Sequence, residues 1–72
     1  MDPLEVHMTL PIRLDHFLKR IGAAQTGGHA KLLIQDGDVQ VDGEIETRRR
    51  RMLQGGERVV VDGEEWVVSV DG

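Results

Sequence analysis

The 72-residue chain has no cysteine, two prolines and only two aromatic residues, Phe17 and Trp66. Without cysteine it can form neither a disulfide framework nor a thiolate metal site. No apolar run approaches the ~20 residues that a membrane-spanning helix needs, and no signal peptide is visible. The scarcity of aromatic residues argues against binding of single strands by serial base stacking. These absences favour a small globular domain of the reducing cytoplasm, with no membrane contact.

The length leaves room for one domain with one thin core, because domains of this size bury only about 60% of their unfolded surface. A complete enzyme with its own substrate cleft does not fit this length. His7, His16 and His29 are too widely spaced for a metal motif, and Ser69 has no histidine or acid at catalytic spacing. The sequence therefore predicts no catalytic residue, no metal, no cofactor and no small-molecule substrate.

Positive charge is concentrated in a chain whose net charge is -4. Residues 13–51 contain eight of the nine Lys and Arg, whereas residues 55–72 contain Arg58 beside five acids. Four of the cations are consecutive, and Glu44 and Glu46 cannot neutralise all of them. A solvated loop is one explanation. The planar fork of arginine suits phosphate oxygens and unpaired bases, so the run favours contact with nucleic acid. The run is Arg48, Arg49, Arg50 and Arg51.

Apolar residues recur at helical spacing in two stretches. The first predicts a helix at about 13–21 that stops at Gly22, a natural left-handed position. The second predicts a helix from an N-cap at Thr26 to a stop at Gly37. The inward residues are expected to be Leu14, Phe17, Leu18 and Ile21 in the first helix and Ala30, Leu33 and Ile34 in the second, with Leu32 partly buried.

Short strands are expected after the second helix. Val39 and Val41 alternate with polar residues, the period of a half-buried strand. Asp42-Gly43 and Asp62-Gly63 each predict a two-residue hairpin, because a type I′ turn needs two residues that tolerate positive φ. The predicted class is α+β, with two short N-terminal helices packed on a small, bent antiparallel sheet. We expect one domain over residues 12–72, preceded by a tail or first short strand over residues 1–11.

Gly27 and Gly28 occupy the first turn of the second helix, where each costs about 0.8–1 kcal/mol relative to alanine in a helix interior. Tight packing against the first helix is one explanation. The other is a bare helix N-terminus, whose free N–H groups approach a phosphate without side chains in the way. The sequence leaves both open.

A joint pattern extends over about residues 12–62: Arg13-Leu14-Asp15, Phe17-Leu18-Lys19, Gly22, Thr26, Ala30-Lys31, Leu33-Ile34, Gly37, Val39, Val41 and Gly43. It resembles the S-four RNA-binding domain, named for small-subunit ribosomal protein four and also called the α-L motif. The Thr-Gly-Gly opening and the Glu46-Thr47-Arg48-Arg49 segment resemble more closely its short stand-alone bacterial members. The chain departs from many members at Gly27, where they carry Arg or Lys, and at Asp42, where they carry Asn.

The resemblance implies an α-L fold that binds RNA against the exposed helix face and the adjoining loop. The expected function is a non-enzymatic module for structured RNA, either ribosomal or transfer RNA, in a ribosome-associated setting. The alternative is a protein adapter that docks a basic ribosomal or ribosome-associated protein through the acidic C-terminal third, at Glu64 and Glu65. The candidate RNA-binding residues are Arg13, Lys19, Arg20, Thr26, Gly27, Gly28, Lys31, Arg48, Arg49, Arg50 and Arg51.

Overall fold

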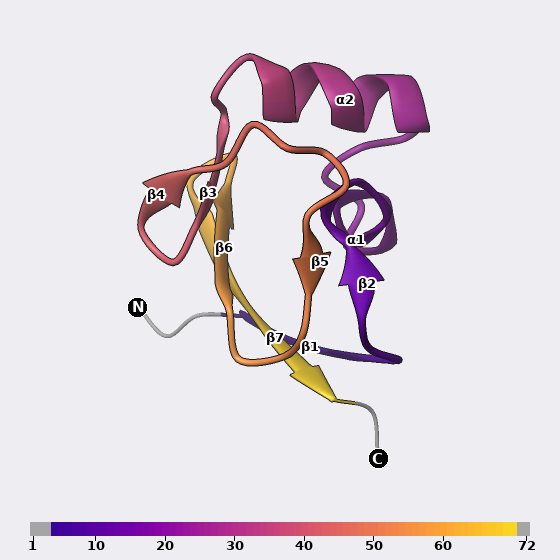
Figure 1. Cartoon of the computed structure of the whole chain (residues 1–72), viewed down its shortest axis with the longest axis vertical. Helices are drawn as coiled ribbons and strands as arrows, with labels where there is room; N and C mark the ends of the chain where they lie inside the picture. The colour runs from indigo at the N-terminus through magenta and orange to yellow at the C-terminus, as the bar shows by residue number, and fades with distance from the viewer. Residues whose placement is uncertain (1–3, 71–72) are drawn as a thin grey trace.

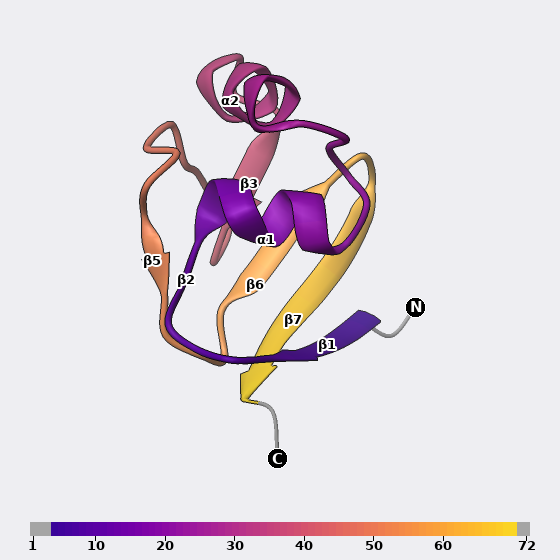
Figure 2. The same ribbon diagram turned by 90° about the vertical axis from the view of Figure 1, so that its right-hand side faces the viewer.

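Two short helices pack beside a small curved sheet in the computed structural model, which describes residues 4–70 (Figure 1). In a view turned by 90°, α1 lies in front of β6 and β7, and α2 lies above α1 (Figure 2). In chain order the elements are β1 (Leu4–Met8), β2 (Ile12–Arg13), α1 (Leu14–Arg20), α2 (Gly27–Gln35), β3 (Val39–Val41), β4 (Glu44–Ile45), β5 (Met52–Leu53), β6 (Arg58–Val61) and β7 (Glu64–Val70).

The main sheet has five strands in the order β1-β7-β6-β3-β4, and β2 pairs with β5 in a separate two-stranded sheet. The pairs are antiparallel except β1 and β7, which run parallel with Leu4 opposite Trp66. The prediction of a purely antiparallel sheet is therefore wrong, because the sheet is mixed. β1 lies within residues 1–11, where the sequence allows a tail or a first short strand, but β2 also precedes the helices and is not predicted. Residues 4–8 alternate apolar and polar side chains, a strand pattern whose partner lies at the other end of the chain.

The helix boundaries agree with the predicted ones to within two residues. Gly22, just after α1, has φ +82°, and Gly37, just after α2, has φ +80°. Both glycines thus adopt the left-handed conformation that ends a helix. Thr26 caps α2 as predicted, because its side-chain hydroxyl accepts a hydrogen bond from the backbone N–H of His29 at 3.0 Å.

Both predicted hairpins are confirmed. Asp42 and Gly43, between β3 and β4, have φ values of 53° and 84°. Asp62 and Gly63, between β6 and β7, have φ values of 53° and 75°. Two consecutive positive φ values are the signature of a type I′ turn, whose twist matches that of the flanking strands.

One buried cluster joins both helices to both sheets. Phe17 is fully buried in it, as predicted, and Ala30 and Ile34 turn the inner face of α2 toward it. Leu32 is 58% exposed, so the expectation of partial burial is wrong. Ala30 and Ile34 lie one helical turn apart, which directs the side chain between them away from the core. No helix within residues 4–70 has the length and hydropathy to span a membrane.

Candidate nucleic-acid interface

The segment that links β4 to β5 carries the four arginines and is fastened to the start of α1. The backbone N–H of Leu14 donates to the carbonyl of Arg51 at 2.8 Å, and that of Asp15 donates to the carbonyl of Arg49 at 3.1 Å. The first N–H groups of a helix have no partner inside it, so these two bonds satisfy groups that would otherwise need water. The pairing of β2 with β5 continues these contacts, so the C-terminal half of the loop is held along the start of α1.

Glu46 binds the side chains of two of the four arginines in the run. Its carboxylate accepts from Arg48 at 3.0 and 3.1 Å and from Arg51 at 2.8 Å, and it also accepts the backbone N–H of Arg48 at 3.0 Å. The side chain of Glu46 is only 8% exposed. The hydrogen bond from Arg48 outweighs the burial that opposes ionisation and, with Arg51, lowers the pKa of Glu46 to about 2. The carboxylate is therefore ionised at any physiological pH.

Asp15 binds the side chain of Arg13 in a similar ion pair. The guanidinium donates from Nε to Oδ1 at 3.1 Å and from Nη2 to Oδ2 at 2.6 Å, and Oδ1 also accepts the backbone N–H of His16 at 2.9 Å. Burial opposes the ionisation of Asp15, but the hydrogen bond and charge of Arg13 prevail, so its pKa lies below the ordinary value. The two-pronged geometry fixes the direction of the Arg13 side chain.

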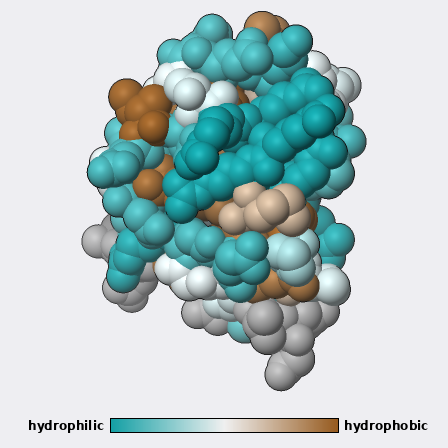
Figure 3. All heavy atoms as spheres, in the orientation of Figure 1, coloured by the Kyte–Doolittle hydropathy of each residue, from teal (hydrophilic) through white to brown (hydrophobic). Residues whose placement is uncertain are grey.

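Arg49 and Arg50 differ from their neighbours. Within residues 4–70, no hydrogen bond or ion pair engages either side chain. Arg50 is exposed and Arg49 is half-buried. The most hydrophilic atoms of this face form one continuous band over the β4–β5 connection, below α2 (Figure 3). The loop thus presents two unpaired guanidiniums on a backbone that their neighbours hold in place.

The outer face of α1 forms an open groove of about 430 Å³, lined by Ile12, His16, Lys19 and Arg20. Lys19 and Arg20 are exposed and lie one turn after His16 on the same helix face. The groove begins at β2, next to Arg13. The structure therefore brings Lys19 and Arg20 to a surface that adjoins the arginine loop.

The first turn of α2 leaves its backbone uncovered by side chains at two glycines. A Cβ added to Gly27 would meet no atom within 4 Å, and one added to Gly28 would meet only the Thr26 hydroxyl, at 3.9 Å. The explanation by tight packing is therefore wrong, and both glycines are exposed. The His29 ring accepts the backbone N–H of Gln25 at 3.3 Å, so His29 helps to fix this helix start. Lys31 is exposed one turn after Gly27.

Sequence reasoning missed the carboxylates that hold the cations. Asp15 and Glu46 are the two charged side chains found buried. Asp15 lies two residues from Arg13, and Glu46 lies two residues from Arg48 and five from Arg51, a spacing that does not by itself distinguish Glu46 from Glu44. Over the part of the chain that the structure describes, no cluster of His, Cys, Asp or Glu side chains could hold a metal ion.

Two helices packed on a small sheet agree with the architecture that the resemblance to the α-L motif implies. The model of the S4 domain family matches residues 6–69, nearly the whole chain, so this chain belongs to that family. The resemblance predicted from the sequence is thereby confirmed.

Two relatives and one solved structure place the chain within the family. YbcJ from Escherichia coli strain K12 is 38% identical over 52 residues, which cover 72% of this chain and 74% of that protein, and YbcJ from Shigella flexneri gives the same values. The solution structure of E. coli YbcJ aligns with a TM-score of 0.69 and 30% identity over 96% of this chain and 90% of that one. That structure is described as revealing an α-L motif involved in RNA binding.

Proposed function

We propose that this chain is an RNA-binding module that contacts structured RNA through the phosphate backbone and through shape. The observation that carries the proposal is the β4–β5 loop, where Glu46 holds Arg48 and Arg51 while Arg49 and Arg50 stay unpaired. Guanidiniums positioned in advance lose little freedom on binding, and their fork fits phosphate oxygens in two-pronged fashion. The solved relative, whose motif is described as involved in RNA binding, supports the same function over the protein-adapter alternative.

Ribosomal or transfer RNA is the expected partner in the cytoplasm, and the module acts by binding alone, with no chemical step. The cations lie on a helix face, a loop and a helix start, which suits a folded RNA whose phosphates approach from several directions. The open start of α2 adds backbone N–H groups around Gly27 and Gly28 that can face one of those phosphates. Ribosomal proteins are further partners under this proposal.

A titration of a fluorescently labelled RNA hairpin with an internal bulge tests the proposal. The double variant Arg49→Glu, Arg50→Glu should weaken binding at least about tenfold and flatten the dependence of log affinity on log salt by about two counterions. Arg58→Glu is the matched control, because Arg58 is exposed but pairs with Glu65, away from the loop. Unchanged affinity in the double variant, with its circular dichroism preserved, would show the arginine assignment to be wrong.

A further inference from the structure

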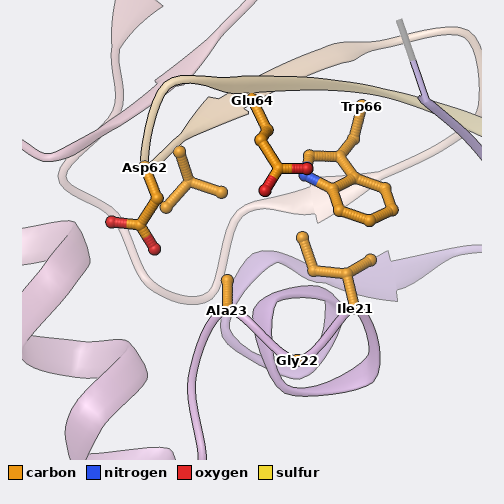
Figure 4. A pocket seen from close by; sticks show the side chains of 7 residues that line it. Ile21, Gly22, Ala23, Asp62, Glu64 and Trp66 are labelled. Carbon is orange, nitrogen blue, oxygen red and sulfur yellow. The ribbon is translucent and has the colours of Figure 1, made fainter.

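A second recess lies between the end of α1 and the turn that joins β6 to β7. Residues 21–23 form one wall, and Val61, Asp62, Glu64 and Trp66 form the other, around a volume of about 120 Å³. Figure 4 shows the Glu64 carboxylate beside the indole of Trp66, with Ile21 facing the ring from the α1 side. We refer to this recess as the Trp66 pocket.

The strand period explains why these side chains converge. Glu64, Trp66 and Val68 alternate onto one face of β7, and Val68 is fully buried there. Glu65 points to the opposite face, where its carboxylate accepts from Arg58 at 2.7 Å. Trp66 is half-buried against the core. In the part of the chain that the structure describes, neither the Asp62 nor the Glu64 side chain has a hydrogen bond or an ion pair.

The volume and the chemistry of the walls select the occupant. Small-molecule sites usually measure about 300–1,000 Å³, so the Trp66 pocket has room for one side chain rather than a cofactor. Ile21 and Ala23 offer an apolar wall for an alkyl stem, and Trp66 offers the ring that attracts cations best. Two carboxylates without partners complete a negative rim. A planar guanidinium stacks on an indole and binds a carboxylate with two hydrogen bonds, which favours arginine over lysine.

We propose that the Trp66 pocket is a docking site for one arginine side chain of a basic protein segment. The charge of the pocket fits such a partner and repels RNA, because both charged side chains that line it, Asp62 and Glu64, are acidic. The pocket is also separate from the arginine loop. In Figure 2 the β4–β5 connection lies to the left of α1 and the β6–β7 turn lies to its right. The domain can therefore bind RNA at the arginine loop and a basic segment at the β6–β7 turn.

Trp66 is the only tryptophan in the chain, so intrinsic fluorescence reports directly on the pocket. The probe is the peptide acetyl-Gly-Gly-Arg-Gly-Gly-amide, and its control is the same peptide with citrulline, which keeps the shape of arginine without the charge. The arginine peptide should change the fluorescence saturably in the millimolar range, and the citrulline peptide should not. Equal responses to the two peptides, or no response to either, would overturn the proposal.

Two matched variants separate the pocket from general attraction to an acidic surface. Glu64→Gln should weaken binding of the arginine peptide at least about fivefold, whereas Glu65→Gln should leave it within about twofold, because Glu65 faces away from the pocket. Equal losses in both variants would refute a specific pocket. Amide chemical shifts give a readout independent of Trp66: those of Gly22 and Ala23 should move with peptide, and that of Gly43 should not.

Discussion

The arginine loop and the turn between β6 and β7 are both highly charged, but they differ in how that charge is balanced. In the loop, buried Glu46 binds Arg48 and Arg51 and fixes their direction. At the turn, Asp62 and Glu64 have no such internal counterion within the described residues. The fold thus builds one surface on which two of the four arginines are held by a buried counterion, and another on which neither carboxylate has an internal counterion.

The separation of the two regions also reconciles a net charge of -4 with the proposed contact between the arginine loop and phosphate. Charges in solution are screened over about 8 Å at physiological ionic strength, so a phosphate at the loop senses the nearby arginines more than the distant acids. Net charge describes the whole surface, whereas binding depends on the local field. RNA affinity should accordingly fall steeply as salt rises.

The largest expected effect comes from removing the counterion in the loop. Glu46→Gln should lower the free energy of unfolding by about 2–3 kcal/mol, because a buried carboxylate then no longer holds two guanidiniums. RNA affinity should fall about threefold or more even though the net charge becomes more positive, because the loop loses its fixed shape. Urea unfolding and the hairpin titration measure the two effects.

Glu44→Gln is the control for that variant. It makes the same change in charge two residues earlier, at an exposed side chain of β4. Stability should stay within about 0.5 kcal/mol, as for most surface substitutions, and RNA affinity should not fall. If both variants raise RNA affinity alike, charge alone controls binding and Glu46 has no positioning role.

The next-largest effect is expected at low pH, where protonation of Glu46 and Asp15 should lower the stability of the protein. The pKa of Glu46 is lowered to about 2, and that of Asp15 is also lowered, so both carboxylates favour the folded state when ionised. A lowered folded-state pKa gives stability that is complete above the ordinary value near 4.5 and disappears as pH falls toward 2. Unfolding free energies should therefore drop by about 2 kcal/mol between pH 5 and pH 2.5, and Glu46→Gln should lose less. An equal drop in both proteins would contradict this assignment.

Gly27→Ala should have a smaller effect than the changes above. It should raise the stability of the protein but lower its affinity for RNA. The added methyl group meets open space and the backbone already has helical geometry, so stability should rise by about 0.5–1 kcal/mol. The methyl group also covers the N–H groups proposed to face phosphate, so RNA affinity should fall. Gln35→Ala, near the other end of α2, serves as the control and should leave RNA affinity unchanged. A stabilised Gly27→Ala variant with unaltered RNA affinity would remove the start of α2 from the interface.

The smallest effect is expected at the exposed ion pair of β6 and β7. Arg58 is 59% exposed, and its contact with Glu65 is a surface pair of the kind that contributes about 0–1 kcal/mol. Arg58→Gln should change the unfolding free energy by less than about 0.5 kcal/mol in urea titrations. A loss of unfolding free energy as large as that of Glu46→Gln would contradict the expectation that the buried carboxylate of Glu46 contributes more than the exposed carboxylate of Glu65.

Local features were predictable from sequence because their causes lie within a few residues. The cap at Thr26, the stops at Gly22 and Gly37 and the two Asp-Gly turns each follow from the conformational preferences of the residues concerned. Phe17 at the core followed from helical spacing. The arginine run was visible as a charge anomaly, although its contact with RNA stays a prediction.

Long-range features were not predictable in the same way. Glu44 and Glu46 look alike in sequence, and only the fold decides that Glu46 is buried between two arginines while Glu44 is exposed. The bond between Asp15 and the carbonyl of Arg49 joins segments that no short pattern relates. The parallel pairing of β1 with β7 likewise depends on the closure of the whole chain. Each of these needs tertiary contacts that a single sequence does not reveal.

Because β1 pairs with β7, this part of the sheet cannot form until β7 has been synthesised. Among the elements described, β1 is synthesised before all the others, and its hydrogen-bonding partner β7 is synthesised after all the others. The backbone hydrogen bonds that tie the arginine loop to α1 need no residue beyond β5, whereas β1 must wait for β7. Because contacts so distant in sequence form slowly, the last step of folding should be the docking of β1 beside β7. A nascent domain can therefore carry a formed cationic loop before its sheet has closed.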